Sequence, residues 1–290
     1  MRHSIRLLAL CALVLALPTQ VGSETASPAP AEAAAAATDA AGLAALLQLD
    51  PTFAVLIDEA GPQAADLEAQ FFPGRGGAEW TEAVLALYDP TALRVRFDTA
   101  FAEALQGQEA TIPAAAAFFA SELGQRILAL EIDARRALID VAVEEAAEVA
   151  AQNLRDRRDP RLRLIRDLIA AGDLVETGVA GTLTAQLAFS DGLAEGSPPG
   201  LVRPRQDRIQ DIWSDEAAVR GETGAWLIRF MVQAYAPLSE EDLRAYVRFS
   251  ETPEGRAVTA ALSRAMEAAL VPVSHDLGRL TARFASSRQI

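Results

Sequence analysis

Two short stretches of the sequence, FFASELGQR at Phe118–Arg126 and FSETPEGRA at Phe249–Ala257, share one pattern. In each, a phenylalanine is followed three residues later by Ser or Thr, and three residues after that by glycine. Ser and Thr are favoured at the N-cap, because the hydroxyl oxygen accepts a hydrogen bond from a free amide of the first helical turn. The pattern therefore predicts a joint in which one helix ends near the phenylalanine and the next begins after the Ser or Thr.

The second stretch has the fuller set of helix-start residues. Thr252 takes the N-cap, Pro253 the first helical position and Gly255 the third, while Ser121 and Gly124 hold the equivalent places in the first stretch. Proline suits the first position because the amide it lacks would be unpaired there. Glycine is costly inside a helix, so its recurrence at one position predicts a close contact. We expect the phenylalanine six residues earlier to cross there.

The two stretches lie 131 residues apart, and this offset aligns further apolar positions. The aligned pairs include Phe97 with Ile228, Phe101 with Val232, and Phe118 with Phe249. Matched apolar positions without a gap predict two related helical hairpin modules. The alternative is a chance similarity between two Ala-rich amphipathic segments, because helical periodicity alone produces some matches.

Helix-start patterns also occur in the rest of the chain. Asp-Pro pairs at Asp50, Asp89 and Asp159 predict an N-cap followed by proline at the first helical position. An apolar residue at every fourth position predicts a buried helical face over Leu93, Phe97, Phe101 and Leu105. No stretch alternates as a strand would, so the predicted fold class is an all-α, multi-helix bundle built from two related hairpin modules.

The later segments are expected to be helical as well. We predict one long helix from about Ser121 to Arg155 and a buried helix over Asp173–Phe189, in which Gly178 and Gly181 permit close packing. A Gly- and Pro-rich break is expected over Ser190–Gly200. The last helices are expected over Asp207–Tyr235, over Glu240–Phe249, and from Thr252 onward with a kink at Pro272.

The N-terminus has the composition of a Sec-type signal peptide. A basic MRHSIR precedes the apolar LLALCALVLAL at Leu7–Leu17, which is too short to span a bilayer. We expect cleavage near Ser23, and no lipoprotein signal because Leu10, before Cys11, is not small. The predicted organisation is a signal peptide at 1–23, a disordered Ala/Pro-rich tether at 24–40, an N-terminal module at 41–192, a linker at 193–206 and a C-terminal module at 207–290. The location is then periplasmic or secreted, with no integral membrane segment after cleavage.

Composition excludes several kinds of chemistry. The only cysteine, Cys11, and one of two histidines, His3, leave with the signal peptide, so His275 is the last histidine. Zinc sites with several histidines and Cys/His dyads are thereby excluded within one exported chain. The net charge of −14 disfavours nucleic acid as a partner. Phosphate-binding and calcium-binding loop motifs are missing, and we predict no cofactor, no metal site and no catalytic residue.

One segment resembles a known family. The stretch APLSEEDLRAYVRFSETPEGRAVTAAL at Ala236–Leu262 contains LSEEDL, an aromatic residue, a phenylalanine and a Thr-Pro-Glu-Gly turn. These features are similar to DUF2059, a family of exported bacterial proteins of unknown function. A diverged second copy is expected at 97–131. The resemblance implies a helical, exported protein and implies no activity or catalytic residue.

Glu131 and Arg135 are the polar pair that stands out. Helical projection places Glu131 toward the apolar side of its helix, and Arg135 follows one turn later, a spacing that favours an ion pair at the edge of the core. The main functional prediction is a non-enzymatic binding or scaffold protein with a helical groove for a protein, a peptide or an apolar ligand. The alternative is a hydrolase-like envelope enzyme with a carboxylate/Arg site. A pocket around Glu131 would favour the enzyme, and an apolar groove would favour binding.

Overall fold

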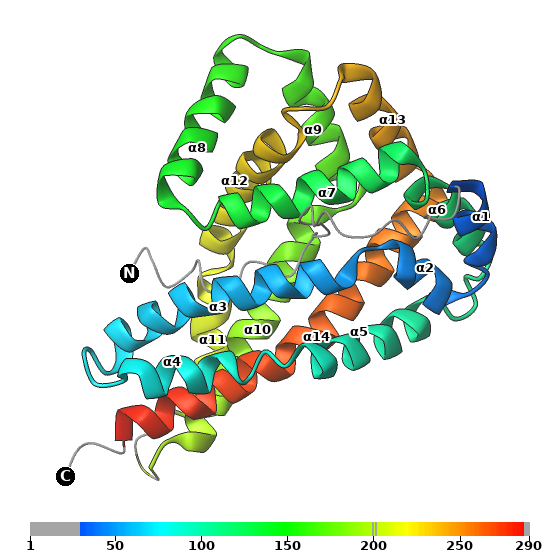
Figure 1. Ribbon diagram of the computed structural model, residues 1–290. Coiled ribbons are helices and arrows are strands. Elements are labelled where there is room, and N and C mark those ends of the chain that lie inside the picture. Colours follow the sequence, from blue (N-terminus) through cyan, green and yellow to red (C-terminus); the bar gives the residue numbers. More distant parts are fainter. Residues whose placement is uncertain (1–29, 199, 201, 287–290) are drawn as a thin grey trace.

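We describe residues 30–198, 200 and 202–286 of a computed structural model (Figure 1). Every regular element in this part of the chain is a helix, which confirms the all-α class. The signal peptide, Cys11 and the expected cleavage site lie outside the described residues. The helices are α1 (Pro30–Ala36), α2 (Ala40–Leu46), α3 (Leu49–Phe71), α4 (Gly77–Leu85), α5 (Pro90–Leu105), α6 (Thr111–Phe119), α7 (Glu122–Ala137), α8 (Val141–Asp156), α9 (Pro160–Ala171), α10 (Leu174–Gly196), α11 (Arg205–Ser214), α12 (Glu216–Tyr235), α13 (Glu240–Ser250) and α14 (Pro253–Ser286).

The helices pack around two large apolar cores. The first, which we call the α14 core, joins α14 to the buried faces of α2 to α6 and includes the predicted stripe of α5. The second, the α12 core, joins α12 to buried residues of α7, α9 and α13. Figure 1 shows α7 between the two groups of helices. Accordingly, α7 contributes Leu128 and Ile132 to the first core and Ile127 and Ala134 to the second.

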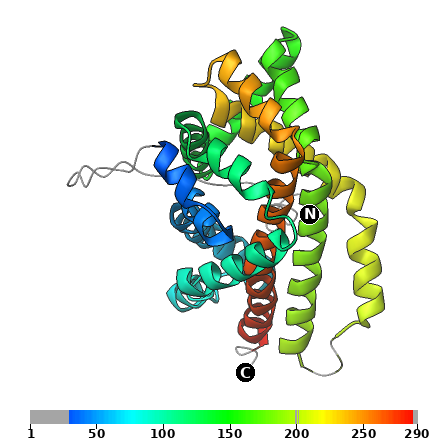
Figure 2. The same ribbon diagram turned by 90° about the vertical axis from the view of Figure 1, so that its right-hand side faces the viewer.

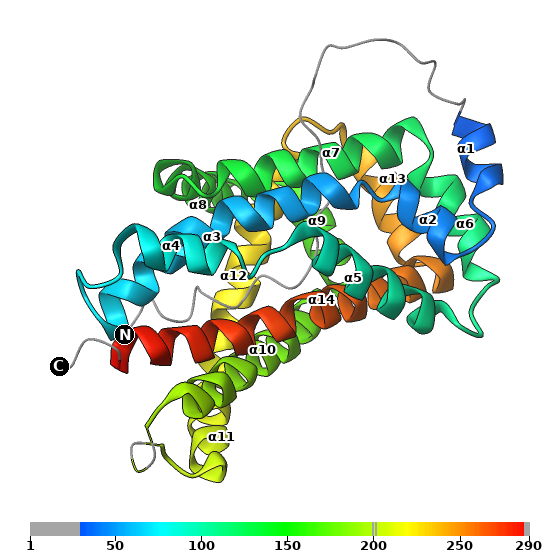
Figure 3. The same cartoon turned by 60° about the horizontal axis from the view of Figure 1, so that its bottom comes forward.

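Both cores contain helices from the N-terminal and C-terminal halves of the chain. In the α14 core, Val258 and Val273 of α14 join Phe97 and Phe101 of α5. Each core therefore contains residues from both sides of the predicted linker at 193–206. The division into two modules stays a prediction from the sequence. Figure 3 shows α14 running along α10 and α5.

The contact between α10 and α14 depends on glycines. A Cβ atom on Gly192 would collide with the carbonyl oxygen of His275, and one on Gly278 would collide with the carbonyl oxygen of Phe189. Figure 2 shows the two helices side by side. Helix α10 continues to Gly196, and both Gly192 and Gly196 lie against the backbone of α14 with no room for a Cβ atom. The predicted break over Ser190–Gly200 is therefore wrong in its first half, where the glycines serve packing rather than a turn.

The Asp-Pro prediction is confirmed at two of its three sites. Asp89 accepts a hydrogen bond from the amide of Ala92 at 2.7 Å, and Asp159 accepts one from the amide of Arg161 at 3.0 Å. At the third site the prediction is wrong. There α3 begins at Leu49 after Gln48, whose φ of 52° places it in the left-handed region, so Asp50 lies inside the first turn.

Three further predictions about helix boundaries are wrong. The helix expected over Ser121–Arg155 is two helices, because the Asp140 side chain accepts from the amide of Ala142 at 2.8 Å and begins α8. The helix expected over Asp207–Tyr235 is also divided, between α11 and α12. The expected tether at 24–40 contains α1, in which Pro30 begins an Ala-rich segment of high helix propensity.

No single helix within the described ranges is long and apolar enough to cross a membrane. Helices α2 and α3 meet the length and composition criterion only as a pair, with a bend of 62° between them. Their buried side chains, among them Leu43, Phe53 and Leu56, belong to the α14 core.

Candidate functional site

The two FxxS/TxxG stretches form two helix joints of the same geometry. At the first joint, between α6 and α7, the amide of Gly124 donates to the Ser121 hydroxyl at 3.0 Å. At the second, between α13 and α14, the amide of Gly255 donates to the Thr252 hydroxyl at 2.9 Å. Each hydroxyl in turn donates to the carbonyl of the phenylalanine three residues earlier, at 2.6 Å and 2.7 Å. The predicted caps are confirmed, with Pro253 in the first turn of α14.

The joint glycines are required by a close approach of the backbone. A Cβ atom at Gly124 would collide with the carbonyl oxygen of Phe118, and one at Gly255 would collide with that of Phe249. The phenylalanine six residues earlier is therefore the crossing residue, as expected. The crossing group is its backbone carbonyl, which turns back over the first turn of the next helix, rather than its ring.

The two joints lie against each other. The rings of Phe118 and Phe249 stack with centroids 3.9 Å apart and planes 2° apart. The ring of Tyr246 also stacks on that of Phe118, with centroids 5.7 Å apart. Both joints consist of capping bonds and packed rings, so their hydroxyls and amides are already bonded within the protein. This arrangement fixes four helices relative to one another.

Glu131 is buried between two tyrosines. Its carboxylate accepts hydrogen bonds from the hydroxyl of Tyr235 at 2.5 Å and from that of Tyr246 at 3.3 Å, and its side chain is 2% exposed. Burial raises the pKa of Glu131 to about 7, although the two tyrosine hydrogen bonds oppose this rise. Burial, together with the charge of Glu131, raises the pKa of Tyr235 and that of Tyr246 well above the ordinary value for tyrosine.

Arg135 pairs with another residue than the one predicted. Its guanidinium donates to both carboxylate oxygens of Glu59 on α3, at 2.6 Å and 2.8 Å, while its side chain is 3% exposed. The predicted ion pair between Glu131 and Arg135 is therefore wrong. The two side chains lie one helical turn apart but point to different neighbours, with Arg135 tying α7 to α3.

His275 lies at the edge of α14 in a cluster of charges. Its Nε2 atom is 3.2 Å from Glu195, and its Nδ1 atom is 3.7 Å from Asp276. Its backbone carbonyl packs against Gly192, so the residue belongs to the contact between α10 and α14. In the part of the chain that the structure describes, no group of three or more His, Cys, Asp or Glu side chains is placed to hold a metal ion.

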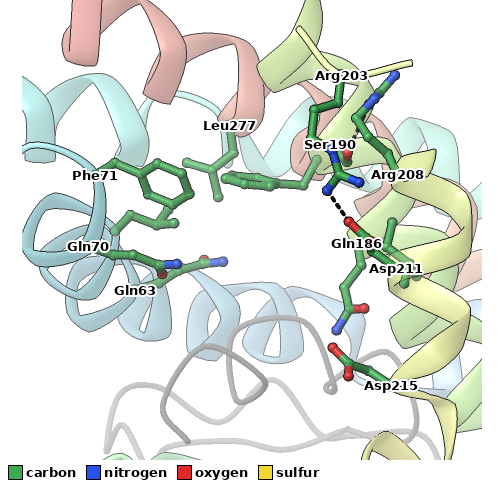
Figure 4. Close-up of a pocket in the computed structure, with 13 residues that line it drawn as sticks. Gln63, Gln70, Phe71, Gln186, Ser190, Arg203, Arg208, Asp211, Asp215 and Leu277 are labelled. Carbon is green, nitrogen blue, oxygen red and sulfur yellow. Dashed lines mark hydrogen bonds and ion pairs between the residues drawn. The ribbon is translucent and has the colours of Figure 1, made fainter. Parts of the chain in front are cut away.

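A pocket of about 390 Å³ opens between α3, α10, α11 and α14 (Figure 4). This volume falls within the usual range for small-molecule sites. Apolar and aromatic side chains form one part of the lining and polar side chains form the other. The lining residues are Gln63, Leu67, Gln70, Phe71, Gln186, Phe189, Ser190, Arg203, Arg208, Asp211, Ile212, Asp215 and Leu277.

The arginines of the pocket are held by protein groups. Arg208 donates to Asp191 at 2.9 Å and to the Ser190 hydroxyl at 2.8 Å, and Arg203 pairs with Asp211. Burial opposes ionisation of Asp191, but the hydrogen bonds from Arg205 and Arg208 lower its pKa below the ordinary value. The bonds of Arg205 and Arg208 fasten α11 to α10, and the pair of Arg203 with Asp211 joins the segment before α11 to α11.

Helix α11 forms one wall of the pocket and is weakly anchored. It buries no residue of its own, and its Trp213 is 58% exposed. Trp80 is fully buried and donates to the carbonyl of Ala64 at 2.7 Å, while half-buried Trp226 stacks on Phe230. Figure 2 shows α11 standing beside α10, at the edge of the molecule.

Sequence reasoning did not find this pocket. Its walls come from helices far apart in the chain, and α11 is polar around most of its circumference, so no periodic pattern marks the site. The one indication of the pocket in the sequence is the pair Ile212 and Trp213, two large apolar residues within an otherwise charged segment near the start of Asp207–Tyr235.

A second pocket of about 390 Å³ lies near the start of α2 and between α5 and α6. Its acidic groups include Asp39, which accepts from the amide of Gly42 at 2.8 Å, and Glu109, which accepts from the amide of Gly107 at 2.9 Å. These carboxylates serve local backbone structure, so the first pocket is the better candidate for a ligand site. Neither of these two pockets is lined by Glu131 or Arg135.

Residues 92–153 match the model of a family described as an uncharacterized protein conserved in bacteria, DUF2059. This match confirms the family that the sequence resembles, and it covers the segment from α5 to α8, including the first joint. The match covers the copy expected at 97–131 but does not include Ala236–Leu262, on which the resemblance was based, so a copy at 236–262, and with it the duplication, stays a prediction. No curated protein and no solved structure matches the chain.

Proposed function

We propose that this protein is exported through a Sec-type signal peptide and acts in the periplasm or outside the cell as a non-enzymatic binding protein. Its ligand site is the pocket between α3, α10, α11 and α14, and its ligand is a small apolar molecule or the apolar end of a peptide. One observation carries this proposal. The pocket offers the rings of Phe71 and Phe189 and the side chain of Leu277 beside a few polar groups, a composition typical of binding sites.

The groups that could support catalysis favour binding over an enzyme. Ser190 in the pocket is bonded by Arg208, which cannot accept a proton as a general base would. Glu131 has the raised pKa often found in catalytic acids. It is nevertheless enclosed by two tyrosines and lies outside the pocket lining, so a buried structural carboxyl accounts for it.

Fluorescence titration with the neutral apolar dye Nile red tests the proposal. We expect saturable binding of one dye per protein in the micromolar range. Gln70→Trp places a bulky ring at the pocket lining and should weaken binding at least about tenfold, which corresponds to about 1.4 kcal/mol. Ala69→Trp adds the same ring at an exposed, neighbouring position of α3 that does not line the pocket, and it should bind as the parent protein does.

Two results would contradict the proposal. One is the lack of saturable dye binding by the parent protein. The other is equal binding by the Gln70→Trp and Ala69→Trp variants, because the dye would then occupy another surface. Circular dichroism of both variants establishes that each is folded.

A further inference from the structure

Some polar groups of the pocket already have hydrogen-bond or ion-pair partners within the protein, and others do not. Arg203 is paired with Asp211, and Arg208 is bonded to Ser190 and to Asp191, which also pairs with Arg205 outside the lining. The charged donors of the pocket are thus committed to protein partners. An anionic ligand would have to displace an existing partner of one of these arginines.

One acceptor in the pocket has no such partner. Among the residues that the structure describes, Asp215 forms no ion pair, and its side chain accepts no hydrogen bond from the chain. Figure 4 shows Asp215 and Gln186 across the pocket from Phe71. A carboxylate and an amide oxygen are both acceptors, and an ammonium group has three donors and no acceptor. The one uncommitted charge in the lining is therefore negative and complements a cation, to which the Gln186 amide oxygen can also accept a bond.

The remaining lining determines what the cation is attached to. Phe71, Phe189 and Leu277 supply apolar surface on which an apolar body would be removed from water. The net charge of −14 raises the concentration of cations near the protein and lowers that of anions. Both features favour a ligand with an apolar body and one positive charge.

We propose that the pocket binds an apolar primary amine, with its ammonium group on Asp215 and Gln186 and its apolar body against Phe71, Phe189 and Leu277. This inference rests on the proposed function, because it names the class of ligand for the same pocket. The amine belongs either to a small molecule or to the N-terminus of an apolar peptide. The two sources share the chemistry that the pocket recognises.

Calorimetric titration with three probes of equal chain length tests the inference. Octylamine, 1-octanol and octanoate have the same apolar body and differ in their charge. We expect octylamine to bind about tenfold more tightly than octanol, since a charge-assisted hydrogen bond is worth roughly that factor, and octanoate to bind most weakly. Asp215→Asn should remove the preference for octylamine over octanol. The matched control Asp207→Asn, at an exposed position of α11 outside the lining, should retain it.

The inference is overturned if octylamine binds no more tightly than octanol, or if the Asp215→Asn variant keeps the full preference. Nile red separates this failure from failure of the proposed function. If the dye binds but octylamine is not preferred, the proposed apolar pocket is retained and only the amine inference fails. If neither the dye nor the amine binds, both proposals fail.

A final comparison identifies the source of the amine. An apolar tripeptide with a free amino end and an amidated carboxyl end is titrated against its acetylated form. Tighter binding than octylamine, lost on acetylation, identifies a peptide N-terminus as the source. Weaker binding than octylamine identifies a small amine.

Discussion

At the scale of single residues, the glycine of each joint is required because a carbonyl oxygen occupies the space of its side chain. Gly255 lies under the carbonyl of Phe249, and Gly124 lies under that of Phe118. Backbone atoms cannot rotate away as a long side chain can. A methyl group at either position therefore forces the two helices of the joint apart.

Alanine at this position should be destabilising, although alanine normally favours helices. We expect Gly255→Ala to lower the free energy of unfolding by about 1–3 kcal/mol, the usual cost of overpacking. The control is Gly221→Ala in α12, where a Cβ atom would meet nothing within 4 Å. That variant should gain up to about 1 kcal/mol from helix propensity. Urea denaturation of both variants measures the difference, and a Gly255→Ala protein as stable as its parent would refute the steric account.

Glu131 should make stability depend on pH in an unusual direction. Its pKa is about 7 in the folded protein and 4.5 in an unfolded chain, so the folded state holds the proton more tightly. The resulting stabilisation is fully present below pH 4.5 and is lost as the pH rises through about 7. We expect the free energy of unfolding to fall by an amount on the order of 1–3 kcal/mol over this window.

The Glu131→Gln variant isolates this effect, because glutamine keeps an acceptor for the tyrosines and does not titrate. Its stability should change less than that of the parent between pH 4.5 and 7. Urea denaturation at several pH values gives both profiles. Parallel profiles for the two proteins would show that Glu131 does not carry the dependence.

At the scale of elements, the helix ends show where sequence and structure correspond. The caps at Ser121, Thr252, Asp89 and Asp159 were predictable because each depends on a bond between residues two or three positions apart. The end of α10 was not, since Gly192 and Gly196 are needed by α14, far along the chain. The same limit applies to Arg135, whose partner Glu59 belongs to another helix.

The glycine contact between α10 and α14 should be sensitive to substitution. Gly278→Ala places a methyl group on the carbonyl of Phe189 in α10. We expect a loss of about 1–3 kcal/mol in the free energy of unfolding. Gly224→Ala in α12, where a Cβ atom would meet nothing within 4 Å, is the control and should not be destabilised. Equal stability of the two variants would contradict the close helix contact.

Helix α11 should be the least protected wall of the pocket. It buries no residue, and its polar bonds to α10 are the pairs of Asp191 with Arg205 and Arg208 and the bond from Arg208 to the Ser190 hydroxyl. Asp191→Asn weakens these pairs, so we expect faster hydrogen exchange of the α11 amides. Asp167→Asn, on α9 and outside this cluster, should leave α11 unchanged. Unaltered exchange of α11 in the Asp191→Asn variant would show that other contacts hold the helix.

At the scale of the whole molecule, the all-α class followed from helix caps and apolar periodicity. The arrangement of the helices did not, because both cores combine segments from the two halves of the chain. The pocket is a consequence of that arrangement. Its lining residues, such as Phe71, Gln186 and Asp215, come from three separate helices or helix ends, and no local pattern connects them.

The joints and the pocket have distinct roles in this account. The stacked rings of Phe118 and Phe249 hold the joints together. The pocket between α3, α10, α11 and α14 is the proposed ligand site. The joints resemble each other because in both a carbonyl oxygen packs against the glycine of the next helix. Ligand binding at the pocket should leave them unchanged.

Hydrogen exchange of the purified protein with and without saturating Nile red tests this central claim most directly. We predict that the dye slows exchange in α11 and in the part of α3 that contains Gln63 and Gln70, while the amides around Gly124 and Gly255 stay as they are. Protection centred on the two joints, or no protection at the pocket while the dye is bound, would contradict the claim.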